Sequence, residues 1–595
     1  MENIIKNRYR LATEATIVVL STLFYGLYNS EVLYRLQENS LFLGTSVFKE
    51  ETLAQSAGYI VYLAKYCMQF LHWPIFAGIM FSLCFIGIER LLNGIKPLRD
   101  EYTILQFLPS VALTLSIFNL GYGTYDTCDV SFAASIVIGT LAATFLAWLQ
   151  CKAEHKFGFK ASAVFFVLYV ILYFIIGIYA CLAALLYSVS SLKDDKKVSL
   201  QKTAAVIVAS LALGYISATY VRCEEFIDAL LSPIPNYYFK ESFIYAIVAA
   251  LLCIGCIAAA QTNLNTEKEL SKKGLIISAL SVPCVMLLTF FMSYRDANFR
   301  TTIKIQHLAE DMKWSQLIDE VKNVEKPTIP IAEYRITALI QEGRIHAELF
   351  NFPCAYDSLN TIHNELEPII YNHDQMLYTG FTNQSLWYCM EDWCSCARSV
   401  SLLRRMTLCA FLNEEYETAK RYLNLLKTTV NYSTWAEEFE GYIANRDKMF
   451  AKYPSLNKAS DWRIPENVKC QNTVLSSLYP KYTSMDGRHM MNRLMLDLYA
   501  MNMRQFRADM AVAWPIFQNG MPKYLQEAVV MNYLLGDKSL PIEKMPISKD
   551  IAEQTRNYVI MARSQATSEK EFDIYKGTYI YYADKANTKV YKRRF

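Results

Sequence analysis

The 595-residue chain contains little charge and no excess of either sign. Its 59 Lys and Arg residues against 56 Asp and Glu residues leave a net charge of +3, so no electrostatic field points to a nucleic-acid partner. Charged residues make up 19% of the chain, against about 25% in a soluble protein. Glycine and proline are also few, at 21 and 17 residues. This composition excludes a disordered or collagen-like protein.

Catalytic motifs built on glycine or histidine are missing from the sequence. There is no G-x4-G-K-[ST], G-x-G-x-x-G, H-E-x-x-H or G-x-S-x-G, and the seven histidines include no i, i+4 pair. ATP-driven transport and zinc proteolysis are therefore not expected, and we predict no cofactor and no metal. The fifteen cysteines favour buried thiols over a zinc site, because Cys394-Ser395-Cys396 lacks C-x2-C spacing. Reduced thiols slightly favour a cytoplasmic location for the C-terminal half.

The charge is unevenly distributed between the two halves of the chain. Residues 1–300 hold 44 charged residues, about 15%, and residues 301–595 hold 71, about 24%. A hydrocarbon core about 30 Å thick needs roughly 20 apolar residues in a helix. Eight stretches of the first half qualify, near 11–29, 70–89, 103–121, 130–150, 161–188, 203–220, 242–261 and 274–293.

The orientation of these stretches is ambiguous. The fifth, 161–188, has no charge over 28 residues, and we expect one tilted helix there. Lys and Arg residues before the first stretch and after the second and fourth define one cytoplasmic side if the stretches alternate. Further lysines after the fifth and seventh stretches contradict that alternation. Eight crossings leave the C-terminal half in the cytoplasm, whereas an odd number places it outside.

The remaining segments are predicted to be helical. Residues 30–69 fit one or two helices along the membrane surface. From about residue 301 short amphipathic helices follow, most clearly an antiparallel pair at 402–413 and 414–429. The run Tyr579–Tyr582 fits a short strand or an interface-seeking segment. We predict an all-α protein, with a transmembrane domain of about eight spans over 1–298 and a degenerate tetratricopeptide-like helical-repeat domain over 299–595.

Acidic residues beside the membrane are the candidate catalytic residues. Glu31 follows the first stretch, and Asp126 and Asp129 follow the third, so all three are expected on the same side. Such carboxylates can act as a general base or bind a divalent ion. The arrangement resembles membrane glycosyltransferases that use polyprenyl-phosphate sugars, which place an acidic base in the first outer loop. That resemblance implies Glu31 as the base, although no Asp-Glu or Asp-Asp pair is present, and ordinary loop acids remain the alternative.

Several segments also resemble an uncharacterised Bacteroidota family of multi-pass inner-membrane proteins. They are residues 419–439, 521–535 and 577–584 in the C-terminal half, and residues 56–78 near the N-terminus. This chain reads Ser56-Ala57-Gly58 where that family has Pro-Gly-Gly. The resemblance implies a membrane domain followed by a helical-repeat tail, and it brings no assigned activity.

The leading functional prediction is a scaffold or accessory protein of envelope assembly in the bacterial inner membrane. Its concave repeat surface would bind a protein partner, and its membrane domain would contact the lipid bilayer. The alternative is a polyprenyl-linked glycosyltransferase with Glu31 as the base. A transporter has little support, because the apolar stretches hold few charges.

Overall fold

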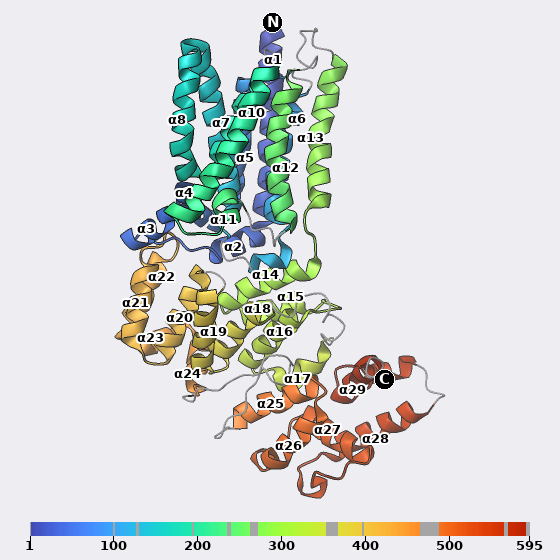
Figure 1. Cartoon of the computed structure of the whole chain (residues 1–595). Helices are drawn as coiled ribbons and strands as arrows, with labels where there is room; N and C mark the ends of the chain where they lie inside the picture. Colours follow the sequence, from blue (N-terminus) through green and yellow to red (C-terminus); the bar gives the residue numbers. More distant parts are fainter. Residues whose placement is uncertain are drawn as a thin grey trace. The chain divides into compact units, whose positions relative to one another are not determined.

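The computed structural model describes an all-helical protein (Figure 1). The residues it describes contain no strand, which confirms the all-α prediction. They are all residues except 1, 99–101, 126–129, 193–195, 235–239, 262–271, 353–366, 396–397, 465–486, 565–568 and 591–595.

The chain divides into two compact units that are not simply its two halves. Unit 1 consists of Met1–Asp296 together with two short segments of the C-terminal half, Cys396–Ser401 and Asn424–Trp435. Unit 2 consists of Ala297–Ser395, Leu402–Leu423 and Ala436–Phe595.

Apolar helices form the body of unit 1. Five are long and apolar enough to cross a membrane, and the described residues contain four shorter apolar helices. By length and composition, these helices suggest a membrane protein. The nine helices are α1 (Glu2–Leu23), α5 (Pro74–Ile95), α6 (Thr103–Phe118), α7 (Phe132–Phe157), α8 (Phe159–Ile176), α9 (Ile178–Ser190), α10 (Lys196–Ile216), α12 (Lys240–Ala259) and α13 (Lys272–Met292).

The fifth apolar stretch is two helices, so the single tilted helix expected over 161–188 is wrong. Helix α8 ends at Ile176 and α9 begins at Ile178. Between them Gly177 has φ +61° and ψ −136°, a conformation that side chains strongly disfavour. Gly158, with φ +60° and ψ −150°, makes a similar turn between α7 and α8. Apolar composition shows where a chain enters the bilayer, but it does not show where the backbone turns.

Polar contacts show which helix ends lie together. The ammonium of Lys202, early in α10, lies 3.8 Å from the Glu154 carboxylate near the end of α7. The Gln261 amide, just after α12, donates to the carbonyl of Val189 at the end of α9. We call this the lysine end of unit 1, because Lys residues gather there.

The opposite end of unit 1 is defined in the same way. The Ser116 hydroxyl near the end of α6 donates to the carbonyl of Ser242 near the start of α12, at 2.6 Å. The Tyr294 amide, just after α13, donates to the carbonyl of Phe118, at 3.3 Å. This end, called the α2 end, carries the short helices α2 (Ser30–Glu38), α3 (Ser46–Ala54), α4 (Gly58–Met68) and α11 (Phe226–Leu231).

Unit 2 is helical throughout its described residues (Figure 1). The predicted antiparallel pair is present as α20 (Val400–Leu412) and α21 (Tyr416–Leu426), joined through Glu414 at φ +66°. Its other helices are α14 (Ala297–Glu310), α15 (Trp314–Val321), α16 (Ile329–Gln341), α17 (Ile345–Glu348), α18 (Glu367–Tyr378), α19 (Thr382–Ser395), α22 (Ser433–Ile443), α23 (Arg446–Lys452), α24 (Pro454–Asp461), α25 (Gly487–Tyr499), α26 (Met503–Ala513), α27 (Lys523–Leu534), α28 (Lys549–Arg563) and α29 (Tyr579–Val590).

The tyrosine run near the C-terminus is neither a strand nor an exposed segment. It begins α29, where Tyr579 is fully buried and Tyr582 nearly so. The Tyr579 ring lies 5.2 Å from that of Phe350, and the Tyr582 ring stacks on Tyr499 at 5.6 Å. Core packing from residues far along the chain overrides the β-propensity of tyrosine here.

Candidate functional site

The structure places one of the three predicted catalytic carboxylates. Glu31 lies in the first turn of α2, immediately beyond the π-helical turn Phe24–Tyr28 that ends the first span, and it is partly buried. Asp126 and Asp129 lie outside the described residues. Within the described part of the chain, no group of three His, Cys, Asp or Glu side chains is placed to hold a metal ion.

Helix α2 carries further charged residues that sequence reasoning missed. Arg35 is 1% exposed and Glu38 is 0% exposed. With Glu31 they follow i, i+4, i+7 spacing, so the three occupy one face of the helix. Leu33 and Leu36 are buried as well, so α2 is enclosed on all sides rather than lying along the surface. Charges buried in this way are retained only in a polar, well-partnered environment.

Part of that environment comes from the C-terminal half of the sequence. Gln37 of α2 is fully buried, and its Oε1 lies 3.3 Å from His72 Nδ1. The Tyr432 hydroxyl donates to the same Gln37 oxygen at 3.5 Å. Next to it, Asn431 Nδ2 donates to the carbonyl of Gln69 at 2.8 Å. Tyr432 and Asn431 belong to the segment Asn424–Trp435 of unit 1.

Backbone hydrogen bonds fix both C-terminal segments of unit 1 to the connection after α2. The Val400 amide donates to the carbonyl of Ser40 at 3.3 Å, and the Gly44 amide donates to the carbonyl of Thr428 at 3.2 Å. A Cβ atom at residue 44 would lie 3.2 Å from that Thr428 oxygen, so the two backbones approach closely here. The α2 end is therefore assembled from residues more than 350 positions apart in the chain, which no local sequence pattern can reveal.

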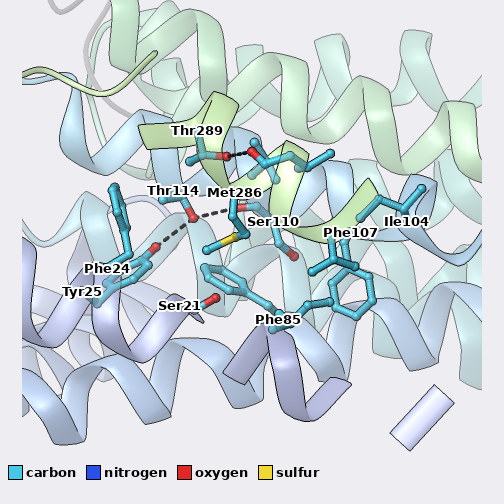
Figure 2. Close-up of a pocket in the computed structure, with 14 residues that line it drawn as sticks. Ser21, Phe24, Tyr25, Phe85, Ile104, Phe107, Ser110, Thr114, Met286 and Thr289 are labelled. Atoms are coloured by element: carbon cyan, nitrogen blue, oxygen red, sulfur yellow. Dashed lines mark hydrogen bonds between the residues drawn. The ribbon is translucent and has the colours of Figure 1, made fainter. Parts of the chain in front are cut away.

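A small cavity of about 30 Å³ lies within the helices of unit 1 (Figure 2). Its walls come from the first span, α5, α6 and α13, and they are mostly aromatic and aliphatic. Phe24 and Tyr25, which line it, stand seven and six residues before Glu31 in the chain. The cavity and the candidate base are thus connected through one short segment.

Most hydroxyl groups around the cavity are already hydrogen-bonded (Figure 2). The Tyr25 and Thr114 hydroxyl oxygens lie 2.9 Å apart, and Thr114 donates to the carbonyl of Ser110 at 2.8 Å. Thr289 donates to the carbonyl of Val285 at 2.8 Å. The Ser110 hydroxyl is buried and has no hydrogen-bond partner among the residues described. The cavity therefore offers a mostly apolar surface, to which the Ser110 hydroxyl adds an unbonded polar group.

Unit 2 contains a separate buried ionic cluster. Arg405 Nε lies 2.5 Å from Asp374 Oδ1, and Arg405 Nη2 lies 2.9 Å from Glu310 Oε1. The Tyr334 hydroxyl donates to Asp374 Oδ2 at 2.7 Å. Burial opposes the charged form of Arg405, but the two carboxylates outweigh it and hold its pKa well above the usual value. Because the cluster ties α14, α16, α18 and α20 together and opens on no described cavity, we interpret it as structural.

These features define the class of the chain as an all-helical membrane protein with a second, all-helical unit. The chain belongs to the family of unknown function designated DUF6057, whose model matches residues 6–586. That match confirms that the chain resembles an uncharacterised family over both halves. No curated protein and no solved structure matches the chain.

Proposed function

We propose that this protein is a membrane enzyme that transfers a sugar from a polyprenyl-phosphate lipid, with Glu31 as the general base. The observation that carries the proposal is the position of Glu31. It lies directly beyond the first span, on a helix whose charged face is otherwise buried, and close in the chain to the apolar cavity. A general base must sit where a water-soluble acceptor and a lipid-linked donor can meet, and the end of a membrane helix satisfies both needs.

The helices beside Glu31 offer an apolar surface to a lipid substrate. The cavity among them has apolar walls, but its volume of about 30 Å³ is that of a single water molecule, so a lipid chain would have to lie against the outside of these helices. The buried charges Arg35 and Glu38 lie on the same face of α2 as Glu31, so the surroundings of the candidate base are polar. We place the protein in the bacterial inner membrane, where such lipids are used.

The test is the isosteric variant Glu31→Gln. Transfer from a synthetic polyprenyl-phosphate sugar in membranes should fall by about 10²–10⁴-fold, the usual contribution of a general base. The matched control is Glu51→Gln, an exposed carboxylate of the same connection, which should leave transfer unchanged. Full activity in Glu31→Gln, or equal losses in the two variants, would exclude Glu31 as the base.

A scaffold role in envelope assembly is the second candidate, and unit 2 favours it. Helix α19 exposes two large apolar side chains one turn apart, Trp387 at 50% and Met390 at 48%. Exposed apolar side chains of this size are typical of protein-binding surfaces on helical repeats. A scaffold would keep its cellular phenotype in Glu31→Gln and lose it when Trp387 and Met390 are both replaced by serine. The enzyme proposal predicts the opposite pattern.

A further inference from the structure

Nearly all the lysine-bearing connections of unit 1 lie at one end of its helices. The glycine turn at Gly177 makes this possible, because α9 leads the chain back to the lysine end before α10: the Cys151 sulfur, near the end of α7, lies 3.5 Å from the Ser190 hydroxyl at the end of α9. The contacts of Lys202 with Glu154 and of Gln261 with Val189 place the connections after α7, α9 and α12 together. The lysines after the fifth and seventh apolar stretches contradict an alternation of eight spans. They agree with an alternation of nine helices, because both groups then lie at the lysine end.

The Lys and Arg residues at this end outnumber those at the α2 end. Short connections rich in Lys and Arg stay in the cytoplasm during membrane insertion, and acidic residues contribute little to this choice. The residues concerned, by their helix or connection, are Lys6, Arg8 and Arg10 on α1, Arg90 and Lys96 at the end of α5, Lys152 and Lys156 on α7, Lys160 on α8, Lys196, Lys197 and Lys202 on α10, and Lys272 and Lys273 on α13. The lysine end is therefore the cytoplasmic end.

Every passage of the chain from unit 1 into unit 2 starts from the α2 end. The first follows α13, where Tyr294 bonds to Phe118 at the end of α6. The others flank the segments Cys396–Ser401 and Asn424–Trp435, whose backbones bond to Ser40 and Gly44. The described residues of unit 2 contain no apolar helix long enough to span a membrane, so the chain does not cross back within them.

We infer that the chain crosses the membrane nine times and that unit 2 works outside the cytoplasm, where it meets an extracytoplasmic partner or substrate. This inference does not depend on the proposed sugar transfer. Two buried thiols of unit 2 are compatible with this location. Cys389 and Cys409 are fully buried, and burial raises the pKa of the Cys409 thiol to about 12, so few reactive thiolates form in an oxidising compartment.

The experiment fuses two reporters, in turn, to Phe595 of the full chain. Alkaline phosphatase is active only outside the cytoplasm. Green fluorescent protein is fluorescent in the cytoplasm, but it does not become fluorescent when it is exported in unfolded form. We expect phosphatase activity at least about tenfold above that of the same reporter inserted after Lys156, together with a dark fluorescent fusion. A bright fluorescent fusion, or inactive phosphatase on a chain present in the membrane, would overturn the inference.

A second measurement keeps the result independent of the fusions. Lys196→Cys adds an exposed thiol at the start of α10. A membrane-impermeant maleimide should label it no more than the parent chain in intact cells and several-fold more after the membrane is permeabilised. Labelling in intact cells would show that the α9–α10 connection is outside, and the nine-crossing arrangement would then be wrong.

Discussion

Replacing Gly177 with alanine tests the helix break on which the topology depends. Gly177 has φ +61°, so any side chain there is strained. Its Cβ would also lie 2.7 Å from the Ser232 carbonyl oxygen and 2.8 Å from the Ala57 Cβ. The break is therefore held by the backbone conformation and by a close approach of two other segments at the α2 end.

The two effects have separate magnitudes. A residue held in so sparsely populated a region costs about 1–3 kcal/mol. Forcing an extra carbon into packed surroundings costs about 1–3 kcal/mol more, because neither the Ser232 backbone nor the Ala57 side chain can rotate away. Gly177→Ala should therefore lower the free energy of unfolding by about 2–6 kcal/mol.

Two matched glycines separate these contributions. Gly158 has nearly the same backbone angles, but a Cβ there meets nothing within 4 Å, so Gly158→Ala should cost only the conformational part. Gly255, inside α12, has neither problem, and Gly255→Ala should be neutral or stabilising by up to about 1 kcal/mol. The assay is the temperature at which the detergent-purified full chain loses its monodisperse peak on size exclusion.

We expect Gly255→Ala to be the most stable of the three variants, Gly158→Ala to be intermediate and Gly177→Ala to be the least stable. If Gly177→Ala were as stable as the original chain, α8 and α9 would form one continuous helix, and the reasoning would be refuted. If Gly177→Ala were as stable as Gly158→Ala, the turn at Gly177 would be supported, but the close approach of Ser232 and Ala57 to this position would be wrong.

Three further predictions concern charged groups. Arg405→Ala leaves two buried carboxylates without their cation and should lower the free energy of unfolding by about 3–5 kcal/mol, measured by heat or denaturant. The control Lys420→Ala breaks an exposed pair and should cost under about 1 kcal/mol. Equal losses in the two variants would show that the Arg405 cluster is solvated. Burial raises the pKa of Glu527, so its stabilising contribution is complete below about pH 4.5 and is lost as pH rises through its folded pKa. Glu527→Gln should therefore gain melting temperature relative to the original chain between pH 5 and pH 8, and parallel pH profiles would contradict this. In unit 1, Arg90→Ala should destabilise the protein more than Glu14→Ala. The Glu14 side chain is 7% exposed and the Arg90 side chain 56%, so only Arg90→Ala leaves a buried charge without its ion-pair partner. The melting temperatures of the two variants in detergent test this order.

The helices of this protein could largely be located from composition and periodicity. The α20–α21 pair was predicted within a few residues, because Leu423 and Leu426 repeat at helical spacing and are fully buried. The turn at Gly177 could not be located, because glycine is common inside membrane helices and gives no stop signal there. The turn at Gly177 divides one apolar stretch into two helices without any change in composition.

Part of the candidate site was visible in the sequence and part was not. Glu31 stood out because a carboxylate follows an apolar stretch. The burial of Arg35, Gln37 and Glu38 depends on packing around α2 and, for Gln37, on Tyr432 of the C-terminal half. Ala57 has φ +55°, a left-handed conformation that glycine adopts more readily than alanine, and the sequence around it gives no sign of this.

The split composition of unit 1 has a consequence for the order of events during synthesis. The ribosome completes the last membrane helix well before it reaches Val400, Thr428 and Tyr432, whose bonds close the α2 end. Until then the polar residues of α2 lack the hydrogen bond that Tyr432 gives to Gln37. We therefore expect a chain that stops after residue 298 to be less stable than the full chain and to be degraded by quality-control proteases.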